Sequence, residues 1–372
     1  MNQAASRIFL CGSNYQVGKQ IGEFYKNSGS PLIRVLVEGP YISKENEHQM
    51  YGLFDEFCPG IKDEVAGFAE ALDVAPEQIL YYAETFLCPG CSQMAILPSI
   101  SANEHTILGR NYDFKDGIEE MSIVTTKISG RNAHVASSAW IFGRGDGLNE
   151  HGLAVSQSSM GIPVTRNMPN TTRAAIKGLQ FWAVIRSVLE NCKNVDEAIQ
   201  WTKAMPIAYN INLMVADKDS NAALIETIDG RKAVKKIDAS TSEQFLYATN
   251  HVHLQDLLPY GPMALKNSVN RQNIICDTLS GKNNISTEDI KRLLSEQYPI
   301  GLNCRYYDSF FGTLRSQLID VNEGTMSVRW GTPEGNEWHT YRVNDEPCYE
   351  MVPVKLIKEA APFDFYEMMK IY

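Results

Sequence analysis

Residues 105–160 contain four short apolar segments that are rich in β-forming residues: HTILGRNYDF (105–114), MSIVTTKIS (121–129), HVASSAWIFG (134–143) and HGLAVSQSSM (151–160). A further segment of the same kind, MAILPSI (94–100), precedes them. Asn, Gly and Asp residues stand between the segments, which is typical of strands that are joined by hairpin turns. This part of the chain therefore predicts a run of antiparallel strands.

Helical patterns lie on both sides of this block. Residues 1–90 are predicted to be mainly helical, because apolar residues recur there at three- and four-residue spacing; the predicted helices cover 15–25, 61–72 and 75–87. Further along, the pattern predicts two helices within 171–203, strands in 211–237 and 245–251, helices at 268–279 and 287–296, and a hairpin at 314–331. Helices and strands are segregated rather than alternating, which favours antiparallel sheets covered by helices, an α+β fold, over a doubly wound parallel sheet.

The composition excludes some classes of protein. The formal net charge is −10 at pH 7, whereas a nucleic-acid partner requires a basic surface. No apolar run approaches the length of a membrane-spanning helix, and the stretch at 8–11 is too short for a signal peptide. We therefore expect a cytoplasmic protein with no nucleic-acid or membrane partner. The eight cysteines are irregularly spaced in a long chain, which does not indicate a disulfide scaffold.

The best candidate for a reactive group is Cys91, in the segment ETFLCPGCSQMAI (84–96). A thiol can attack the carbonyl carbon of the preceding residue, and water can then release the upstream piece. Gly90 suits that position, because glycine tolerates a distorted backbone and has no obstructing side chain. The cut would leave Cys91 with a free α-amine, which titrates near pH 8 and can deprotonate the neighbouring thiol without a histidine.

The segment GRNYDF (109–114) supplies two candidate partners for this thiol. Arg110 can lower the thiol pKa or bind a substrate carboxylate, and Asp113 can bind and orient the new ammonium group. The two residues are three positions apart, so a flat strand would direct them to opposite faces. A shared site for both side chains therefore requires a bend or a bulge in this strand.

These motifs, taken in order, resemble those of the penicillin acyltransferase-like and choloylglycine hydrolase-like N-terminal-nucleophile (Ntn) hydrolases, which are linear-amide acylases. The helical leader DEVAGFAEALDVAPEQIL (63–80) is similar to the leader of the autoproteolytic branch. Gly90 and Cys91 match the cleavage site and the nucleophile, and Arg110 and Asp113 match the arginine and aspartate of the family. Further matches are the strand LNEHGLAVSQSS (148–159), Asn250 in YATNH and Arg271 in SVNRQNI.

The resemblance implies a four-layer αββα sandwich, with residues 1–90 as a leader that is retained as a small subunit after cleavage and residues 91–372 as the catalytic domain. It implies that Asn250 and the backbone amide of Ser159 hold the oxyanion, and that Arg271 is a late active-site arginine. At the position of Ser159 the hydrolase branch tends to have asparagine, so the side chain of this serine is not assigned a role. The implied activity is cleavage or transfer of the acyl group of a linear amide, with no metal and no organic cofactor.

Two other hypotheses remain open at this stage. One is a homologue that folds but is never cut and has no activity. The other is a thiol redox protein, because Cys88 and Cys91 form a C-x-x-C motif; such a motif normally follows a strand and opens a helix, and here a predicted helix precedes it. A zinc site would require a second matching pair of cysteines, which Cys304 and Cys348 do not provide. The histidines at 151, 251 and 253 are interpreted as structural.

The substrate is expected to be a small-molecule amide, and the chain is expected to form a homo-oligomer. Aromatic side chains after the nucleophile are candidates for an apolar acyl pocket: Tyr112, Phe114, Trp140 and Phe142. Arg110 or Arg271 is a candidate for binding a carboxylate on the leaving-amine side. The predicted substrates are therefore N-acyl amino acids, short N-acyl peptides or penicillin-like amides.

Overall fold

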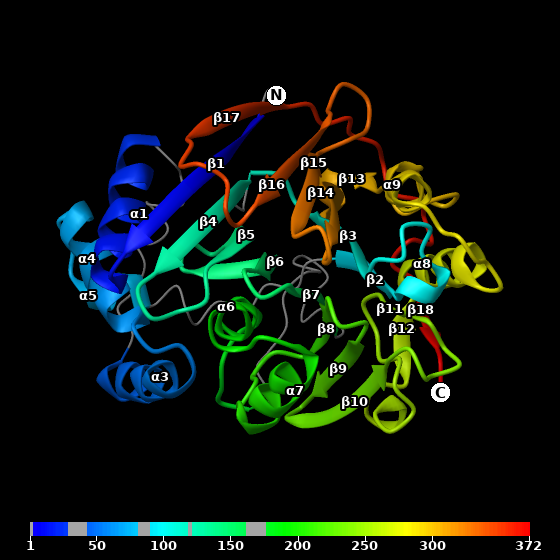
Figure 1. The fold of residues 1–372 in the computed structure, drawn as a ribbon, viewed down its shortest axis with the longest axis horizontal. Helices are drawn as coiled ribbons and strands as arrows, with labels where there is room; N and C mark the ends of the chain where they lie inside the picture. The colour runs from blue at the N-terminus through cyan, green and yellow to red at the C-terminus, as the bar shows by residue number, and fades with distance from the viewer. Residues whose placement is uncertain (1–2, 29–42, 81–89, 118–120, 161–175) are drawn as a thin grey trace.

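The computed structural model describes residues 3–28, 43–80, 90–117, 121–160 and 176–372 (Figure 1). Within these ranges the strands form a nine-stranded sheet (the large sheet), a seven-stranded sheet (the small sheet) and a two-stranded ribbon. The large sheet has the order β10-β9-β8-β7-β6-β5-β4-β1-β17. The small sheet has the order β11-β2-β3-β14-β15-β16, with β13 paired to β14.

The strands of the large sheet are β1 (Gln3–Gly12), β4 (Ser122–Ile128), β5 (His134–Ala139), β6 (Gly143–Asn149), β7 (Leu153–Ser159), β8 (Ile211–Asp217), β9 (Ala222–Ile228), β10 (Arg231–Ile237) and β17 (Glu350–Val354). Those of the small sheet are β2 (Gly90–Ile96), β3 (Ile107–Phe114), β11 (Phe245–Ala248), β13 (Arg305–Tyr306), β14 (Phe311–Asp320), β15 (Thr325–Trp330) and β16 (Trp338–Arg342). The ribbon consists of β12 (Met263–Leu265) and β18 (Met368–Lys370).

The helices of the described ranges are α1 (Asn14–Ser28), α3 (Lys44–Phe57), α4 (Ile61–Leu72), α5 (Pro76–Leu80), α6 (Phe181–Asn191), α7 (Val195–Ala204), α8 (Lys266–Leu279) and α9 (Thr287–Ser295). Their boundaries follow local signals in the sequence. The Ser286 hydroxyl and the Asp289 carboxylate cap the start of α9 reciprocally, and the Asn194 side chain accepts from the backbone of Glu197 at the start of α7.

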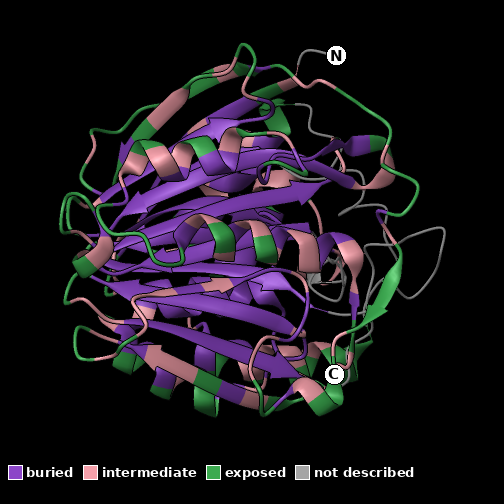
Figure 2. Ribbon diagram, turned by 90° about the vertical axis from the view of Figure 1, so that its right-hand side faces the viewer, coloured by how far each residue is buried: buried purple, intermediate pink, exposed green. Residues whose placement is uncertain are grey.

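Three apolar clusters hold the layers together. The two sheets face each other across a core that includes Leu108, Ile123, Leu148, Met214 and Ile319. The other face of the large sheet packs on α1, α3, α4, α6 and α7, and the other face of the small sheet packs on α8 and α9. Figure 2 shows the central strands as buried layers, with exposed residues on the outer sides of the helices, in loops and on outer strands. This is a four-layer αββα sandwich, so the predicted fold class is confirmed.

Strand β1 departs from the prediction, because residues 3–12 were expected to belong to a mainly helical region. The segment pairs in parallel with β4 and antiparallel with β17. Both partners are more than a hundred residues away in the chain, so nothing local identifies this pairing. The first described residues therefore form an integral strand of the large sheet.

Two other predicted helices are shorter than expected. Helix α5 ends at Leu80, and the rest of the predicted helix 75–87 lies outside the described residues. Helix α6 begins only at Phe181, because Leu179 pairs with Ile207 in an isolated bridge. A Cβ on Gly178 would lie 2.4 Å from the carbonyl oxygen of Pro206, so the close approach of these two segments requires glycine. Within the described ranges, no helix is both long and apolar enough to cross a bilayer.

Candidate active site

Cys91 is the second residue of β2, and its side chain is completely buried. In the antiparallel pairing of β2 with β3, Cys91 lies opposite Tyr112 and Gln93 lies opposite Arg110. Residues that lie opposite one another share a face, and so do residues two apart on a strand. The Gln93 amide donates to the backbone carbonyl of Asn212 in the large sheet (2.8 Å). Cys91 therefore directs its sulfur into the space between the two sheets.

Gly90 is held against an aromatic ring. A Cβ atom added at this position would lie 2.3 Å from ring carbons of Phe311, closer than real Cβ contacts allow. Any side chain here would displace the ring, so packing requires glycine at the residue before the thiol. This is a second reason for glycine, in addition to the chemical one considered from the sequence.

Arg110 lies directly beside the thiol. Its Nη2 donates to Cys91 Sγ at 3.1 Å, while Nη1 donates to the carbonyl oxygen of Gly145 at 2.7 Å and to the carboxylate of Asp146. Burial raises the pKa of the Cys91 thiol, and the positive charge of Arg110 acts in the opposite direction. Arg110 is thus placed to stabilise a thiolate in a site that would otherwise disfavour one.

Asp146 fixes the guanidinium of Arg110. Its carboxylate also accepts from the Gln317 amide (2.6 Å) and from the Ser137 hydroxyl, and Nη2 of Arg315 lies 3.6 Å away. Burial opposes ionisation of Asp146, yet Arg110 and Arg315 hold its pKa below the usual range. Asp146 therefore stays charged and keeps Arg110 oriented toward the sulfur.

Asn250 and Arg271 hold the backbone of Cys91. The Cys91 N–H donates to Asn250 Oδ1 at 2.9 Å, and Arg271 Nη2 donates to the same oxygen at 2.8 Å. Arg271 Nη1 donates to the carbonyl oxygen of Cys91 and to the Ser92 hydroxyl (2.9 Å). Asn250 thus contacts the nitrogen that would become the α-amine, and Arg271 holds both Asn250 and the Cys91 carbonyl group.

Ser159 joins this group through its backbone. Asn250 Nδ2 donates to the carbonyl oxygen of Ser159 at 2.8 Å. The Ser159 hydroxyl lies 3.4 Å from the hydroxyl of Tyr209, away from this contact. The end of β7 therefore reaches the site through main-chain atoms.

Asp113 lies on the other face of β3 from Arg110. It is directly opposite Gly90, accepts from the Thr313 hydroxyl at 2.6 Å and lies 4.0 Å from Arg271 Nη1. Burial raises the pKa of Asp113 to about 6, and Arg271 acts against this rise. The Asp113 carboxylate therefore lies next to the Gly90–Cys91 peptide bond, on the face of the small sheet that packs on α8.

The bend or bulge in β3 that a shared site was predicted to require is not found in this strand. The β2–β3 register runs without a break, and the irregularity lies in β14, between Thr313 and Arg315. The two side chains instead approach the start of β2 from its two faces. Arg110 lies beside the sulfur, and Asp113 lies on the side of the preceding peptide.

Sequence reasoning missed Asp146 and Thr313. Both contact a predicted site residue, but each lies on a strand that is remote in sequence from its partner. The segment GRGDGLN around Asp146 carries no motif that would single it out. Only the stacking of the two sheets brings this aspartate to Arg110.

The histidines near the site have structural partners. His253 Nε2 accepts from the backbone N–H of Thr249 at 2.9 Å, and His251 hydrogen-bonds with Ser268 (2.8 Å) and Gln272 (2.6 Å). Burial lowers the pKa of His251 to about 4 and that of His253 well below its usual value, so both rings are neutral at pH 7.

Cys88 of the C-x-x-C motif lies outside the described residues.

The four candidate pocket aromatics fall into two groups. Tyr112 and Phe114 pack in one cluster with Cys91. Trp140 and Phe142 pack in the cluster on the helical face of the large sheet, where the ring of Phe142 lies 5.0 Å from that of Phe68. The structure therefore brings Tyr112 and Phe114 to the thiol, and it does not bring Trp140 and Phe142 there.

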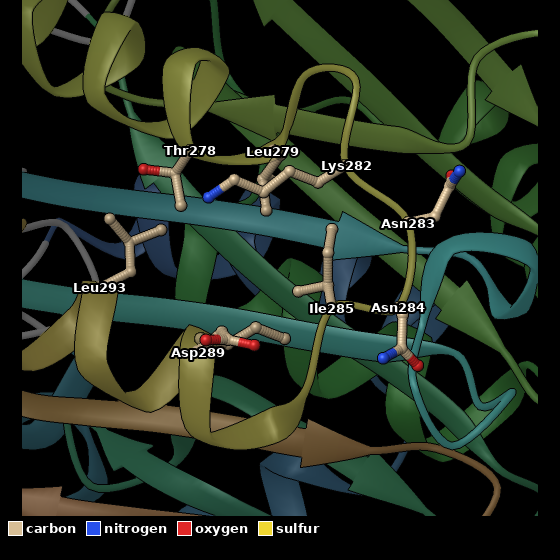
Figure 3. A pocket seen from close by; sticks show the side chains of 9 residues that line it. Thr278, Leu279, Lys282, Asn283, Asn284, Ile285, Asp289 and Leu293 are labelled. Atoms are coloured by element: carbon tan, nitrogen blue, oxygen red, sulfur yellow. The ribbon is translucent and has the colours of Figure 1, made fainter.

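A small cleft between α8 and α9 has a different lining (Figure 3). Its volume is about 150 Å³, and its lining residues are Thr278, Leu279, Lys282, Asn283, Asn284, Ile285, Asp289, Ile290 and Leu293. None of these lining residues is one of the predicted site residues.

Among the residues that the structure describes, no three His, Cys, Asp or Glu side chains are grouped so that they could hold a metal ion.

Comparison with known proteins adds family information to this geometry. Residues 101–335 match the model of the family "Acyl-coenzyme A:6-aminopenicillanic acid acyl-transferase". No curated protein sequence matches the chain. The matched range is more than half of the chain but begins after Cys91.

Similar solved structures include penicillin V acylase from Agrobacterium tumefaciens (16% identity, TM-score 0.44, covering 70% of this chain and 90% of that chain). Another is a mutant of conjugated bile acid hydrolase from Clostridium perfringens (14%, 0.46, 73% and 98%). A third is the Caenorhabditis elegans orthologue of N-acylethanolamine-hydrolyzing acid amidase (15%, 0.45, 62% and 93%). On the strength of the family match, the chain belongs to the acyl-coenzyme A:6-aminopenicillanic acid acyl-transferase family.

Proposed function

We propose that this enzyme cuts its own chain between Gly90 and Cys91 and then uses Cys91 to hydrolyse or transfer the acyl group of a linear amide. The observation that carries the proposal is the buried group around Cys91: Arg110 contacts its sulfur, and Asn250 and Arg271 contact its main chain. No step requires a metal or an organic cofactor.

In the self-cleavage step, Cys91 Sγ attacks the carbonyl carbon of Gly90. The C–N bond breaks, the nitrogen takes a proton, and a thioester links Gly90 to the sulfur. Water then hydrolyses the thioester, which releases the Gly90 carboxylate and restores the thiol. Asp113 lies opposite Gly90 in the β2–β3 pairing, which suits it to orient the reacting peptide.

In turnover, the free α-amine of Cys91 accepts the thiol proton and the thiolate attacks the substrate carbonyl. Asn250 Nδ2 and the backbone amide of Ser159 donate to the oxyanion that develops. The α-ammonium returns the proton to the leaving amine. Water or an acceptor amine then takes the acyl group from the sulfur, so comparing product formed with and without added amines separates hydrolysis from transfer.

The positive charge of Arg271 supports the role of the α-amine as a base. Its Nη2 hydrogen-bonds to the same Asn250 oxygen as the Cys91 nitrogen does. A neighbouring cation disfavours the protonated form of an amine, so Arg271 favours the neutral amine that the reaction requires.

Retention of the leader after the cut is supported by contacts that its described parts make with the rest of the fold. Strand β1 lies between β4 and β17 in the large sheet. Arg186 of α6 donates to both carboxylate oxygens of Glu64 in α4, at 2.8 and 2.5 Å, and these side chains are fully buried. Losing the leader would expose sheet backbone and leave Arg186 without one of its two carboxylate partners.

The buried Glu64–Arg186 pair gives a test of this retention. Breaking a buried ion pair by removing one partner costs about 3–5 kcal/mol, so Glu64→Ala should release the residue 1–90 piece at a clearly lower urea concentration than wild type. Lys19→Ala, which removes an exposed pair with Glu70, is the matched control and should cost at most about 1 kcal/mol. Equal release curves for the two variants, measured by native mass spectrometry, would contradict the retention model.

The proposed substrates have an apolar acyl group and a carboxylate. Tyr112 and Phe114, which pack with Cys91, are suited to line an acyl pocket. Arg110 and Arg271 already have protein partners on both Nη atoms, which argues against direct binding of the carboxylate by either one. The excess of positive charge supports an anionic substrate instead, since Arg110, Arg271 and Arg315 outnumber Asp113 and Asp146 around the thiol.

A substrate panel tests this proposal. N-acyl amino acids, bile-salt conjugates and phenoxyacetyl amides should be turned over, and long or aromatic acyl groups should be cleaved faster than acetyl. Amidated or decarboxylated analogues should react more slowly than the acids, because they lose the attraction to the positive site. Equal rates for acids and amides would rule out the carboxylate preference, and equal rates for acetyl and aromatic acyl groups would rule out the pocket.

Homo-oligomerisation and a cytoplasmic location stay predictions from the sequence.

A further inference from the structure

Asn250 lies in a loop without regular secondary structure. The loop covers residues 249–254, directly after β11, which is the edge strand of the small sheet. No helix or strand ladder fixes its backbone, so the hydrogen bonds that its peptide groups make must do so. The position of Asn250 Oδ1, 2.9 Å from the Cys91 nitrogen, depends on those bonds.

Glu226 holds one end of this loop. The residue lies on β9 of the large sheet, opposite Asn212 of β8 and Ala233 of β10, and it is completely buried. One carboxylate oxygen accepts from the backbone N–H of His253 at 2.7 Å, and the other accepts from the backbone N–H of Leu254 at 2.9 Å. Hydrogen bonds to an ionised carboxylate are stronger than those between neutral groups.

Two neutral side chains of the large sheet hold the other end. Asn212 Nδ2 donates to the carbonyl oxygens of Thr249 (2.9 Å) and His251 (3.0 Å). The Ser158 hydroxyl donates to the same Thr249 oxygen at 2.5 Å. Asn250 thus lies between two anchored peptide groups. Of these anchors, Glu226 is the one that titrates.

We propose that Glu226 is a positioning residue whose ionised carboxylate holds the 249–254 loop so that Asn250 meets Cys91. This inference rests on the proposed function of the site. Protonation converts one carboxylate oxygen into a hydroxyl, a poorer acceptor that brings its own proton toward the backbone N–H. The loop then loosens, and Asn250 loses its alignment with the nucleophile and the oxyanion. Turnover is therefore highest when Glu226 is charged.

Burial raises the pKa of Glu226 to about 7, although the hydrogen bonds from Leu254 and His253 act against the rise. Glu226 therefore gains or loses its proton in a pH range in which the folded enzyme can be assayed. On the neighbouring strand β10, the charged residues on the same face as Glu226 are Arg231 and Lys235, whereas Lys232 and Lys236 lie on the opposite face, as does Asp217 of β8. The loop, β11 and α8 add His251, His253, Tyr247 and Arg271. The two histidines stay neutral above pH 6, because burial lowers both of their pKa values.

The raised pKa also has a consequence for stability. Between the ordinary pKa of a glutamate and about pH 7, the folded state binds a proton that the unfolded state has lost. The contribution of Glu226 to stability is therefore fully present at low pH and falls as pH rises toward 7. The contribution of Glu226 to stability thus falls as pH rises, whereas turnover should rise as Glu226 ionises. These opposite pH dependences distinguish a positioning role from general stabilisation of the fold.

The test is Glu226→Gln in the full-length protein, with Glu150→Gln as the matched control. Glu150 also accepts from a backbone N–H, that of Ala133 at 2.9 Å, but it is exposed and lies at the other end of β7 from Ser159. At pH 8 the kcat of Glu226→Gln on an N-acyl amino acid should be on the order of 10-fold below wild type, which is the effect of losing one charge-assisted hydrogen bond. The part of the wild-type fall in kcat near pH 7 that comes from Glu226 should be absent from this variant, whereas the falls that come from protonation of the α-amine and of Asp113 should remain.

Hydrogen exchange supplies a readout that does not depend on activity. The amides of residues 253 and 254 should exchange on the order of 10-fold faster in Glu226→Gln than in wild type at pH 8, whereas Glu150→Gln should match wild type. A Glu226→Gln variant with the wild-type pH profile and wild-type exchange would overturn the positioning role. Failure of the proposed function would appear differently, as turnover that survives the loss of the Cys91 thiol while the exchange result stands.

Discussion

Cys91→Ala is expected to remain a single uncut chain and to have no measurable amide turnover. The same sulfur performs both reactions in the proposed function, so one substitution removes both. The effect is large because no other thiol occupies this position: Arg110 donates to Cys91 Sγ, and the α-amine that serves as the base forms only after the cut. Intact mass and turnover of an N-acyl amino acid, measured on one preparation, check the two losses together.

Cys304→Ala is the matched control for this variant. Cys304 is also a fully buried thiol, and its pKa is raised well above the usual value by burial and by Asp113, with Arg271 acting in the other direction. It therefore shares the charged surroundings of Cys91 without the contact to Arg110. The control should be cut and should turn over like wild type. Activity that persists in Cys91→Ala would mean that the nucleophile is assigned to the wrong residue.

Asn250→Ala is expected to lower kcat by roughly 100-fold or more, the usual effect of losing one oxyanion donor. The protein should still fold, because the loop keeps its anchors at Glu226, Asn212 and Ser158. Steady-state kinetics should show the loss in kcat rather than in KM, since the missing interaction forms mainly in the transition state.

Asn250→Asp refines this prediction. The carboxylate keeps an oxygen for the Cys91 nitrogen and for Arg271, but it loses the N–H donor of Nδ2. A loss of turnover similar to that of the alanine variant would assign the effect to the donor. Asn336→Ala is the control, because the Asn336 amide also donates to two backbone carbonyls, those of Thr332 and Lys355. Normal turnover in both Asn250 variants would show that the oxyanion site lies elsewhere.

Much of the candidate site could be found from the sequence because the family motifs occur in a fixed order. Cys91, Arg110, Asn250 and Arg271, predicted from separate segments, are brought into direct contact in the structure. The helices at 61–72, 268–279 and 287–296 were also predictable to within two residues, because amphipathic periodicity and caps are local signals.

The remainder depends on contacts between segments that are remote in sequence. Asp146 reaches Arg110 only because one sheet stacks on the other, and Glu226 reaches the Asn250 loop for the same reason. Strand β1 has its partner β4 more than a hundred residues downstream. Trp140 was assigned to an acyl pocket from its proximity in sequence, yet it packs on the helical side of the large sheet. In each case the local sequence has no feature that records the tertiary partner.

The most direct test of the central claim is the intact mass of freshly purified wild-type protein, measured under denaturing conditions. Protein that turns over a linear amide should show two species, with the masses of residues 1–90 and 91–372. A single full-length species in protein of full activity would contradict the central claim, since Cys91 would then act without a free α-amine.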